Sequence, residues 1–258
     1  MGKITIKNRK GQKMVVVVDH AEHPKGLAFV MHGLGSSKDS PRIQLIAQTF
    51  NEKGFTAVRF DTTNTFGESD GNYEDATITN YYEDLEDAIA WAKNQPWHQE
   101  PYILAGSSLG GICVTLYAEA HPQEVRALAP IAPVISGALR IEASNRRDPG
   151  RFERWKAAGY EDEQSEKVPG LMKRLKYSHV EDSMQYDTLP GAKKLTMPVL
   201  LIVGSEDDIT PPDHVQKLFD AIPAGKKELH VIKGMGHAFK EEYFPQVRAI
   251  FERWIDTV

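Results

Sequence analysis

The sequence predicts an α/β protein in which helices cover a mostly parallel sheet. Short apolar and β-branched runs, bounded by turn residues, alternate along the chain with segments whose apolar residues recur at helical spacing. This alternation is typical of strand–helix–strand units, which build parallel sheets with helices packed against them. The 258 residues allow one large domain, with or without an insertion, and suffice to bury a core without disulfides or metals.

The predicted strands begin with a hairpin. Lys3–Lys7 and Lys13–Val18 flank a turn at residues 8–11, a pattern that favours two paired strands. The later runs are too short for helices and are apolar throughout, as expected of strands covered on both faces. These runs are Gly26–His32, Thr56–Phe60, Tyr102–Ala105, Val125–Ile131, Val199–Val203 and Glu228–Ile232.

Three helices are predicted from apolar residues that fall on one helical face. One begins near residue 80, one directly after residue 108, and one ends the chain after Pro245, a residue type that suits the first turn of a helix. Their apolar faces are Tyr81, Leu85, Ala88, Ile89 and Ala92; Ile112, Cys113, Leu116, Tyr117 and Ala120; and Val247, Ile250, Phe251, Trp254 and Ile255.

The segment from residue 136 to 190 breaks this alternation. It is dense in charged residues, is interrupted by Pro149-Gly150 and Pro169-Gly170, and contains no convincing strand. Its scattered aromatic residues favour a local core, and its charges favour a solvated face. We expect a small helical cap over the strand ends, so that residues 1–135 and 191–258 form the core and residues 136–190 form the cap.

Composition limits the partners and the location. The net charge is −5, so no overall basic field favours nucleic acid as a partner. No apolar run approaches the length of a membrane span or of a signal peptide, and we expect a cytoplasmic protein without a membrane span. Cys113 is the single cysteine, which excludes an intrachain disulfide, and its place on an apolar helix face predicts a buried thiol.

Residues 104–111 read LAGSSLGG and contain a Gly-x-Ser-x-Gly pattern centred on Ser108. Because the predicted strand ends at Ala105 and a helix follows from Leu109, Ser108 lies on a sharp strand-to-helix turn. Glycines two residues before and two after it relieve the crowding of such a turn. A pattern centred on Ser107 would need glycine where Ala105 and Leu109 stand, so the sequence predicts Ser108 as the nucleophile.

A carboxylate and a histidine follow two later strands. The run that ends at residue 203 leads into a loop with Asp207 and Asp208, and either carboxylate emerges at the carboxyl end of the sheet. His237 lies in a glycine-rich loop after the next strand. A serine becomes a nucleophile when a base takes its proton and a third group orients that base. We expect His237 to be the base and an aspartate to orient it.

The first long strand runs into the turn His32-Gly33-Leu34-Gly35. Such a turn can direct the backbone N–H of Leu34 toward an oxyanion, beside the N–H of Leu109. His32 is expected to form structural hydrogen bonds below this turn. The chain order serine, aspartate, histidine is that of enzymes with a nucleophile elbow, not that of chymotrypsin or subtilisin.

These motifs resemble those of the α/β-hydrolase superfamily, and the resemblance covers nearly the whole chain. Gly106–Gly110 is similar to the nucleophile elbow, His32-Gly33 to the oxyanion loop, residues 204–211 to the acid loop and Gly236-His237 to the histidine loop. The resemblance implies the α/β-hydrolase fold: an eight-stranded, mostly parallel sheet flanked by helices, with a small helical cap inserted.

The resemblance also decides between the two aspartates. The acid of this superfamily stands third after a glycine, here Gly204, which favours Asp207; Asp208 is then expected to cap the following helix. The loop Arg59–Gly71 is similar to a further superfamily loop, but it has a threonine and a phenylalanine where a glycine is usual. We assign that loop no catalytic role.

The sequence therefore predicts a serine hydrolase that cleaves carboxylic esters of small molecules through an acyl-enzyme on Ser108, without a metal or cofactor. Its layout is most similar to small carboxylesterases of the feruloyl or cinnamoyl type. A small peptidase or aminopeptidase, a thioesterase and a monoacylglycerol-type lipase would use the same Ser108, Asp207 and His237. A binding protein that has lost catalysis is the alternative from another class, although such proteins usually lack one of the three residues. The sequence does not give the oligomeric state.

Overall fold

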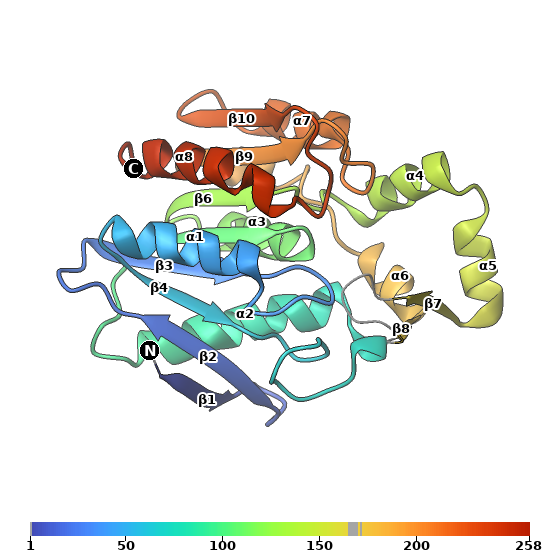
Figure 1. The fold of residues 1–258 in the computed structure, drawn as a ribbon, viewed down its shortest axis with the longest axis horizontal. Helices are drawn as coiled ribbons and strands as arrows, with labels where there is room; N and C mark the ends of the chain where they lie inside the picture. Colours follow the sequence, from blue (N-terminus) through green and yellow to red (C-terminus); the bar gives the residue numbers. More distant parts are fainter. Residues whose placement is uncertain (1, 165–169, 171) are drawn as a thin grey trace.

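The computed structural model describes residues 2–164, 170 and 172–258, and its main sheet has the strand order β1-β2-β4-β3-β5-β6-β9-β10 (Figure 1). The strands are β1 (Lys3–Lys7), β2 (Lys13–Asp19), β3 (Gly26–Met31), β4 (Phe55–Phe60), β5 (Tyr102–Ser107), β6 (Val125–Ile131), β9 (Val199–Gly204) and β10 (Lys227–Ile232). β2 pairs antiparallel with β1 and with β4, and the remaining pairs are parallel. The predicted fold class, a mostly parallel eight-stranded sheet, is confirmed.

Helices cover both faces of this sheet. They are α1 (Pro41–Glu52), α2 (Ile78–Lys93), α3 (Leu109–Ala120), α7 (Pro212–Ala221) and α8 (Phe244–Ile255), with the short 3-10 helices η1 (Tyr73–Asp75), η2 (Ala192–Lys194) and η3 (Glu241–Tyr243). In β3, Phe29 belongs to the core under α2 and α3, whereas Val30 belongs to the core under α1 and α8. A strand buried on both faces has no polar alternation, as in β3. The expectation that the run Glu228–Ile232 is covered on both faces is wrong, because β10 is an edge strand in which only Ile232 is buried.

The helix starts follow local chemistry. Thr77 caps α2, since its hydroxyl accepts a hydrogen bond from the N–H of Asn80 at 3.1 Å. Prolines stand in the first turn of α1, α7 and α8, including Pro245 as predicted. Helix α1 was not among the predicted helices, although its buried residues recur at helical spacing. No helix in the described part of the chain is both long and apolar enough to cross a membrane.

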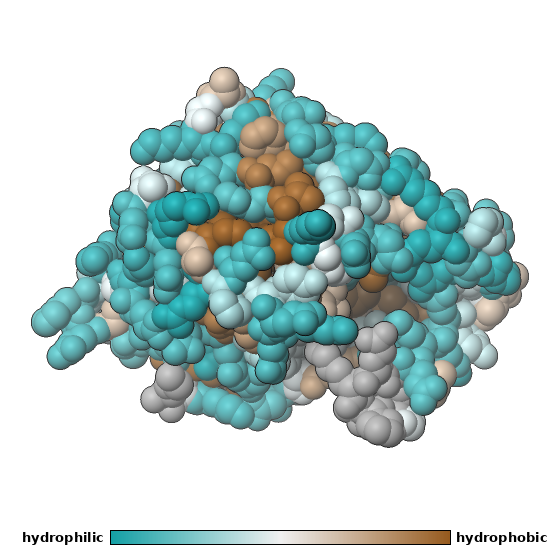
Figure 2. All heavy atoms as spheres, turned by 45° about the horizontal axis from the view of Figure 1, so that its top comes forward, coloured by the Kyte–Doolittle hydropathy of each residue, from teal (hydrophilic) through white to brown (hydrophobic). Residues whose placement is uncertain are grey.

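Residues 136–190 leave the sheet after β6 and return before β9, and we call them the insertion. They contain α4 (Gly137–Arg147), α5 (Arg151–Ala158), β7 (Tyr160–Gln164), β8 (Met172–Lys176) and α6 (Ser178–Ser183). Figure 1 shows the insertion at the right of the sheet. Figure 2 shows apolar side chains at the floor of a hollow between the insertion and the body of the molecule. Residues 165–169 and 171 of the predicted cap lie outside the described residues.

The expectation of an insertion without strands is wrong, because β7 and β8 form an antiparallel hairpin. Its residues are mostly exposed and charged, and Arg174 of β8 donates two hydrogen bonds of 2.8 Å to Asp162 of β7. The guanidinium of Arg174 also lies 4.0 Å from the ring centre of Tyr160. Cross-strand charge pairs hold this hairpin instead of an apolar face, so a search for apolar runs does not detect it.

Two aromatic residues of the insertion, Phe152 and Trp155, are buried as predicted, whereas Tyr160 is exposed. Trp155 is buried, stacks on Phe152, and donates its indole N–H to the carbonyl of Leu175 at 3.0 Å. The predicted burial of Cys113, on α3, is also confirmed.

Candidate active site

Ser108 occupies a sharp turn between β5, which ends at Ser107, and α3, which begins at Leu109. Its backbone has φ 54° and ψ −114°, a conformation that residues with a Cβ rarely adopt. The flanking glycines make this turn possible: a Cβ at Gly106 would lie 2.4 Å from the carbonyl oxygen of Gly110, and a Cβ at Gly110 would lie 2.5 Å from that of His32. The serine is therefore held on a strained turn that only glycine neighbours permit.

His237 links this serine to Asp207. Its Nε2 lies 2.9 Å from the Oγ of Ser108, and its Nδ1 lies 2.9 Å from one carboxylate oxygen of Asp207 and 3.1 Å from the other. Asp207 follows β9, and His237 lies in the loop after β10. The structure thus brings together three side chains that are separated by up to 129 positions in the sequence.

The two loops that carry Asp207 and His237 are fixed to each other. A Cβ at Gly204 would lie 1.9 Å from the carbonyl oxygen of Met235, so the close approach of the loops requires glycine at this position. The N–H of Gly234 also donates to the hydroxyl of Ser205 at 2.9 Å. These contacts set the position of the imidazole relative to the carboxylate.

The carboxylate of Asp207 is fully buried and has several donors besides His237. It accepts hydrogen bonds from the N–H groups of Ile209 at 3.0 Å and Thr210 at 2.8 Å, and from the hydroxyl of Thr210 at 2.9 Å. The same hydroxyl lies 3.0 Å from the carbonyl oxygen of Ala132. Sequence reasoning missed Thr210, because a threonine three residues after an aspartate is no distinctive signal.

Asp208 points elsewhere. Its side chain is 66% exposed, and its cationic partner among the described residues is Arg147 at 3.9 Å. The expectation that it caps α7 is wrong: the residue at the cap position is Pro211, without a side-chain hydrogen bond. The carboxylate that closes this turn is instead Asp207, through its bonds to the two following N–H groups.

The turn after β3 runs directly against the serine. A Cβ at Gly33 would lie 3.0 Å from the Cβ of Ser108 and 3.6 Å from its Oγ. Leu34 follows Gly33 in this turn. Leu109 is the first residue of α3, where a helical N–H has no acceptor within the helix.

His32 lies below this turn and is fully buried. Its Nε2 accepts the N–H of Thr62 at 3.1 Å, so the proton of the neutral ring is on Nδ1, which donates to the carbonyl of Gly33 at 2.8 Å. Burial lowers the pKa of His32, which keeps the ring neutral. The predicted structural role of His32 is confirmed.

A family model described as serine aminopeptidase, S33 (Hydrolase_4) matches residues 22–158 and 180–243, which is more than half of the chain. The chain belongs to this family. The α/β-hydrolase resemblance predicted from the sequence motifs is thereby confirmed.

Relatives of this Hydrolase_4 chain include an Escherichia coli protein named uncharacterized 31.7 kDa protein in the traX-finO intergenic region, 27% identical over 263 residues and matched over 90% of each chain. The bovine mitochondrial palmitoyl-protein thioesterase ABHD10 is 25% identical over 221 residues, which cover 84% of this chain and 68% of the thioesterase. Est1E from Butyrivibrio proteoclasticus, solved with ferulic acid bound, has a TM-score of 0.80 at 21% identity and 98% coverage of both chains. Its similarity is one of fold.

Sequence reasoning also missed a buried lysine, Lys38, in the loop that follows the turn with Leu34. The ammonium of Lys38 binds the carboxylates of Asp61 and Asp39 at 2.9 Å and that of Glu68 at 2.6 Å. Burial alone would lower the pKa of Lys38, but these hydrogen bonds raise it above its ordinary value. Asp61 also accepts the N–H of Lys38 at 2.7 Å, so the loop Arg59–Gly71 supports the turn that contains Leu34.

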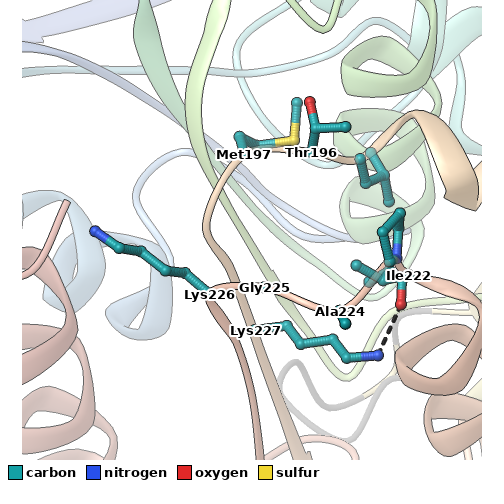
Figure 3. A pocket seen from close by; sticks show the side chains of 9 residues that line it. Thr196, Met197, Ile222, Ala224, Gly225, Lys226 and Lys227 are labelled. Carbon is teal, nitrogen blue, oxygen red and sulfur yellow. Dashed lines mark hydrogen bonds between the residues drawn. The ribbon is translucent and has the colours of Figure 1, made fainter.

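A cavity of about 90 Å³ lies far from this site (Figure 3). Met197, which precedes β9, and Lys227, which begins β10, line it, so it lies at the opposite ends of these strands from Asp207 and His237. The ammonium of Lys227 already binds the carbonyls of Phe219 and Ile222 at 2.7 Å each. This cavity is separate from the candidate active site.

Proposed function

We propose that this protein is a serine hydrolase that cleaves carboxylic esters through an acyl-enzyme on Ser108. The observation that carries the proposal is the unbroken chain of contacts of 2.9 Å from Ser108 through His237 to Asp207. Each of these residues follows a different parallel strand at its carboxyl end, where open α/β sheets hold their sites. Membership of a hydrolase family supports the same reading.

In the first half of the reaction His237 Nε2 removes the proton of Ser108, and Oγ attacks the acyl carbon. Asp207 accepts the Nδ1–H of His237, which holds the tautomer that leaves Nε2 free to act as a base. The negative charge that develops on the carbonyl oxygen is stabilised by the N–H groups of Leu34 and Leu109. The imidazolium then gives its proton to the leaving alcohol.

In the second half a water molecule replaces the alcohol. His237 removes a proton from the water, the hydroxide attacks the ester carbon of the acyl-enzyme, and Ser108 recovers its proton as the acid leaves. Every proton and charge in this sequence is handled by the side chains and amides named, so the reaction as written requires no metal or cofactor.

We further propose that residues 136–190 act as a cap over this site, with residues 1–135 and 191–258 as the core. Contacts between α4 and the acid-loop helix support this arrangement. Arg146 of α4 donates to Asp213 of α7 at 2.9 Å and 3.2 Å. Leu139 of α4 and Thr210 beside Asp207 line one narrow cavity.

Thioester cleavage is the second candidate, because the relatives with 84% coverage of this chain include palmitoyl-protein thioesterases. The likeness to Est1E, which was solved with ferulic acid bound, favours aryl esters of the feruloyl type. The family is described as serine aminopeptidase, so an aminopeptidase activity is tested as well. A monoacylglycerol-type lipase would use the same residues.

The test is a panel of 4-nitrophenyl esters of increasing acyl length, methyl ferulate, an acyl thioester and a peptidyl anilide, each measured with the wild type and with Ser108→Ala. We expect the wild type to be most active on oxygen esters and Ser108→Ala to lose about 10⁴-fold or more in kcat. Ser107→Ala is the matched control and should retain activity. A rate that Ser108→Ala leaves unchanged would refute the mechanism, and a preference for the thioester would replace the ester assignment.

A further inference from the structure

Helices α4 and α5 of the insertion carry five arginines, and four of them have carboxylate partners. The pairs are Arg146 with Glu142 and Asp213, Arg147 with Asp208, Arg151 with Glu161, and Arg154 with Asp148. Arg140 is the exception within the described residues: its Nη1 is inaccessible to water and has no hydrogen-bond partner there. A buried, unpaired donor on a charged group is costly, so its presence calls for an explanation.

Arg140 lies beside the proposed site. Together with Val134 and Thr210 it lines a narrow cavity of about 10 Å³ under α4. The N–H of Val134 donates to the carbonyl of Ser108 at 3.1 Å, and the hydroxyl of Thr210 binds Asp207. Arg140 therefore lines the same cavity as residues that bond directly to Ser108 and to Asp207.

The groups around Arg140 do not neutralise it. Burial lowers the pKa of Arg140 to about 10, and the positive charge of Arg151 adds to this effect, while Tyr73 and Glu161 oppose it. The guanidinium thus stays protonated at neutral pH. The carboxylate of Glu161 is already bound by Arg151 through both of its oxygens, at 2.6 Å and 2.5 Å.

Two other neighbours are uncharged. Burial lowers the pKa of His179 to about 3, so this ring is neutral, and its Nδ1 lies 2.8 Å from the carbonyl oxygen of Ala76. Burial raises the pKa of Tyr73 above its ordinary value, so the phenol is neutral as well. Tyr73 packs against the oxyanion turn, since a Cβ at Gly35 would lie 2.9 Å from its ring.

We infer that Arg140 binds an anionic group of the substrate, a carboxylate or a phosphate, at a distance from the ester bond. Such a group would supply the acceptor that Nη1 of Arg140 lacks among the described residues, and the planar fork of arginine matches both anions. The inference rests on the proposed function and narrows its substrates to esters that carry a negative charge.

The test compares pairs of esters that differ by one charge. The first pair is 4-nitrophenyl hydrogen glutarate and 4-nitrophenyl methyl glutarate, which places the carboxylate on the acyl side. The second pair is 4-acetoxybenzoate and methyl 4-acetoxybenzoate, which places it on the alcohol side. The readout is the ratio of kcat/KM for the charged member to kcat/KM for the neutral member, so a general loss of activity cancels.

We expect the wild type to prefer the charged member of at least one pair, and Arg140→Gln to lower that ratio by roughly ten- to a hundredfold. Arg140→Lys, which keeps the charge but not the fork, should retain part of the preference. Arg146→Gln, on the same helix but with its arginine paired and exposed, is the matched control and should leave the ratio as in the wild type. An equal ratio in the wild type and in Arg140→Gln for both pairs would overturn the inference.

A second readout separates this inference from the proposed function. Calorimetric titration of the Ser108→Ala protein with benzoate and with phenyl phosphate measures anion binding without turnover and distinguishes the two anions. We expect binding of at least one anion, and its loss when Arg140→Gln is added to Ser108→Ala. Hydrolysis that does not depend on Ser108 would refute the proposed function. The titration would still decide whether Arg140 binds an anion, because it does not require turnover. Anion binding that persists in the double variant would refute that role.

Discussion

At the scale of single residues, the site depends on one strained backbone and one buried carboxylate. Holding Ser108 at positive φ costs about 1–3 kcal/mol, and the glycines around it exist to make that conformation possible. Asp207 differs from its neighbour Asp208 in burial: the first is enclosed by donors and the second is 66% exposed. Two adjacent residues of the same type thus have different chemistry.

The first prediction uses this pair. Asp207→Asn should lower kcat by about 10⁴-fold, because the amide can stabilise the wrong tautomer of His237. Asp208→Asn should change kcat by less than about twofold, since surface substitutions away from the site are usually small in effect. Steady-state kinetics on one 4-nitrophenyl ester measure both. A large loss in Asp208→Asn, with Asp207→Asn unaffected, would reverse the assignment.

Residues that the sequence did not single out share one property. Thr210, Lys38 and Arg140 are ordinary polar side chains whose roles come from burial, and burial by distant segments cannot be read from a local pattern. Ser108 and His237 could be proposed from the sequence because glycines and strand ends mark them locally. That Nη1 of Arg140 has no partner among the described residues can be seen only when its neighbours are known.

At the scale of elements, patterns of apolar residues predicted those strands that are buried on both faces. They failed for β7 and β8, which are held by pairs such as Arg174 with Asp162 and leave most of their residues exposed. Periodicity predicts an element when the element has an apolar face. An exposed hairpin of charged residues looks like a solvated loop.

The contact between α3 and the chain segment that follows the insertion contains a buried acid. Glu119 is 7% exposed, and its Oε1 has no hydrogen-bond partner in the described part of the chain. A Cβ at Gly191 would lie 2.1 Å from Oε2, so the chain that returns from the insertion passes directly over this carboxyl. Burial raises the pKa of Glu119 to about 8, Lys194 lowers it and Asp187 raises it.

This contact makes stability depend on pH. The pKa of Glu119 lies above its ordinary value of 4.5 in the folded protein. Between about pH 4.5 and 8 the carboxyl is therefore protonated in the folded protein and ionised in the unfolded chain. The free energy of unfolding therefore falls as pH rises through this window, with a slope of at most about 1.4 kcal/mol per pH unit from this group. Glu119→Gln cannot ionise and should be more stable than the wild type at pH 8.5, with a much smaller difference at pH 5.

Urea denaturation at the two pH values measures this difference. Glu181→Gln, at an exposed position of α6, is the control. Its free energy of unfolding should differ from that of the wild type by the same amount at both pH values. A Glu119→Gln protein whose advantage is the same at pH 5 and pH 8.5 would show that the carboxyl is not protonated in the fold.

At the scale of the whole molecule, parallel strands deliver four loops to one edge of the sheet. The turn after β3, the elbow after β5, the acid loop after β9 and the histidine loop after β10 meet there, and the insertion begins just after β6 (Figure 1). The order of these loops could be predicted from the sequence because fold topology fixes it. The hairpin of β7 and β8 and the environment of Arg140 on α4 could not be predicted, since both depend on contacts between residues from different elements.

The central claim is that Ser108 is the nucleophile, and covalent labelling tests it most directly. The protein is treated with a fluorophosphonate, digested, and the modified residue is located by tandem mass spectrometry. The account predicts one adduct per chain on Ser108 and the same labelling in Ser107→Ala. It predicts no labelling in Ser108→Ala or in His237→Ala. An adduct on Ser107, or labelling of Ser108→Ala to the extent of the wild type, would contradict it.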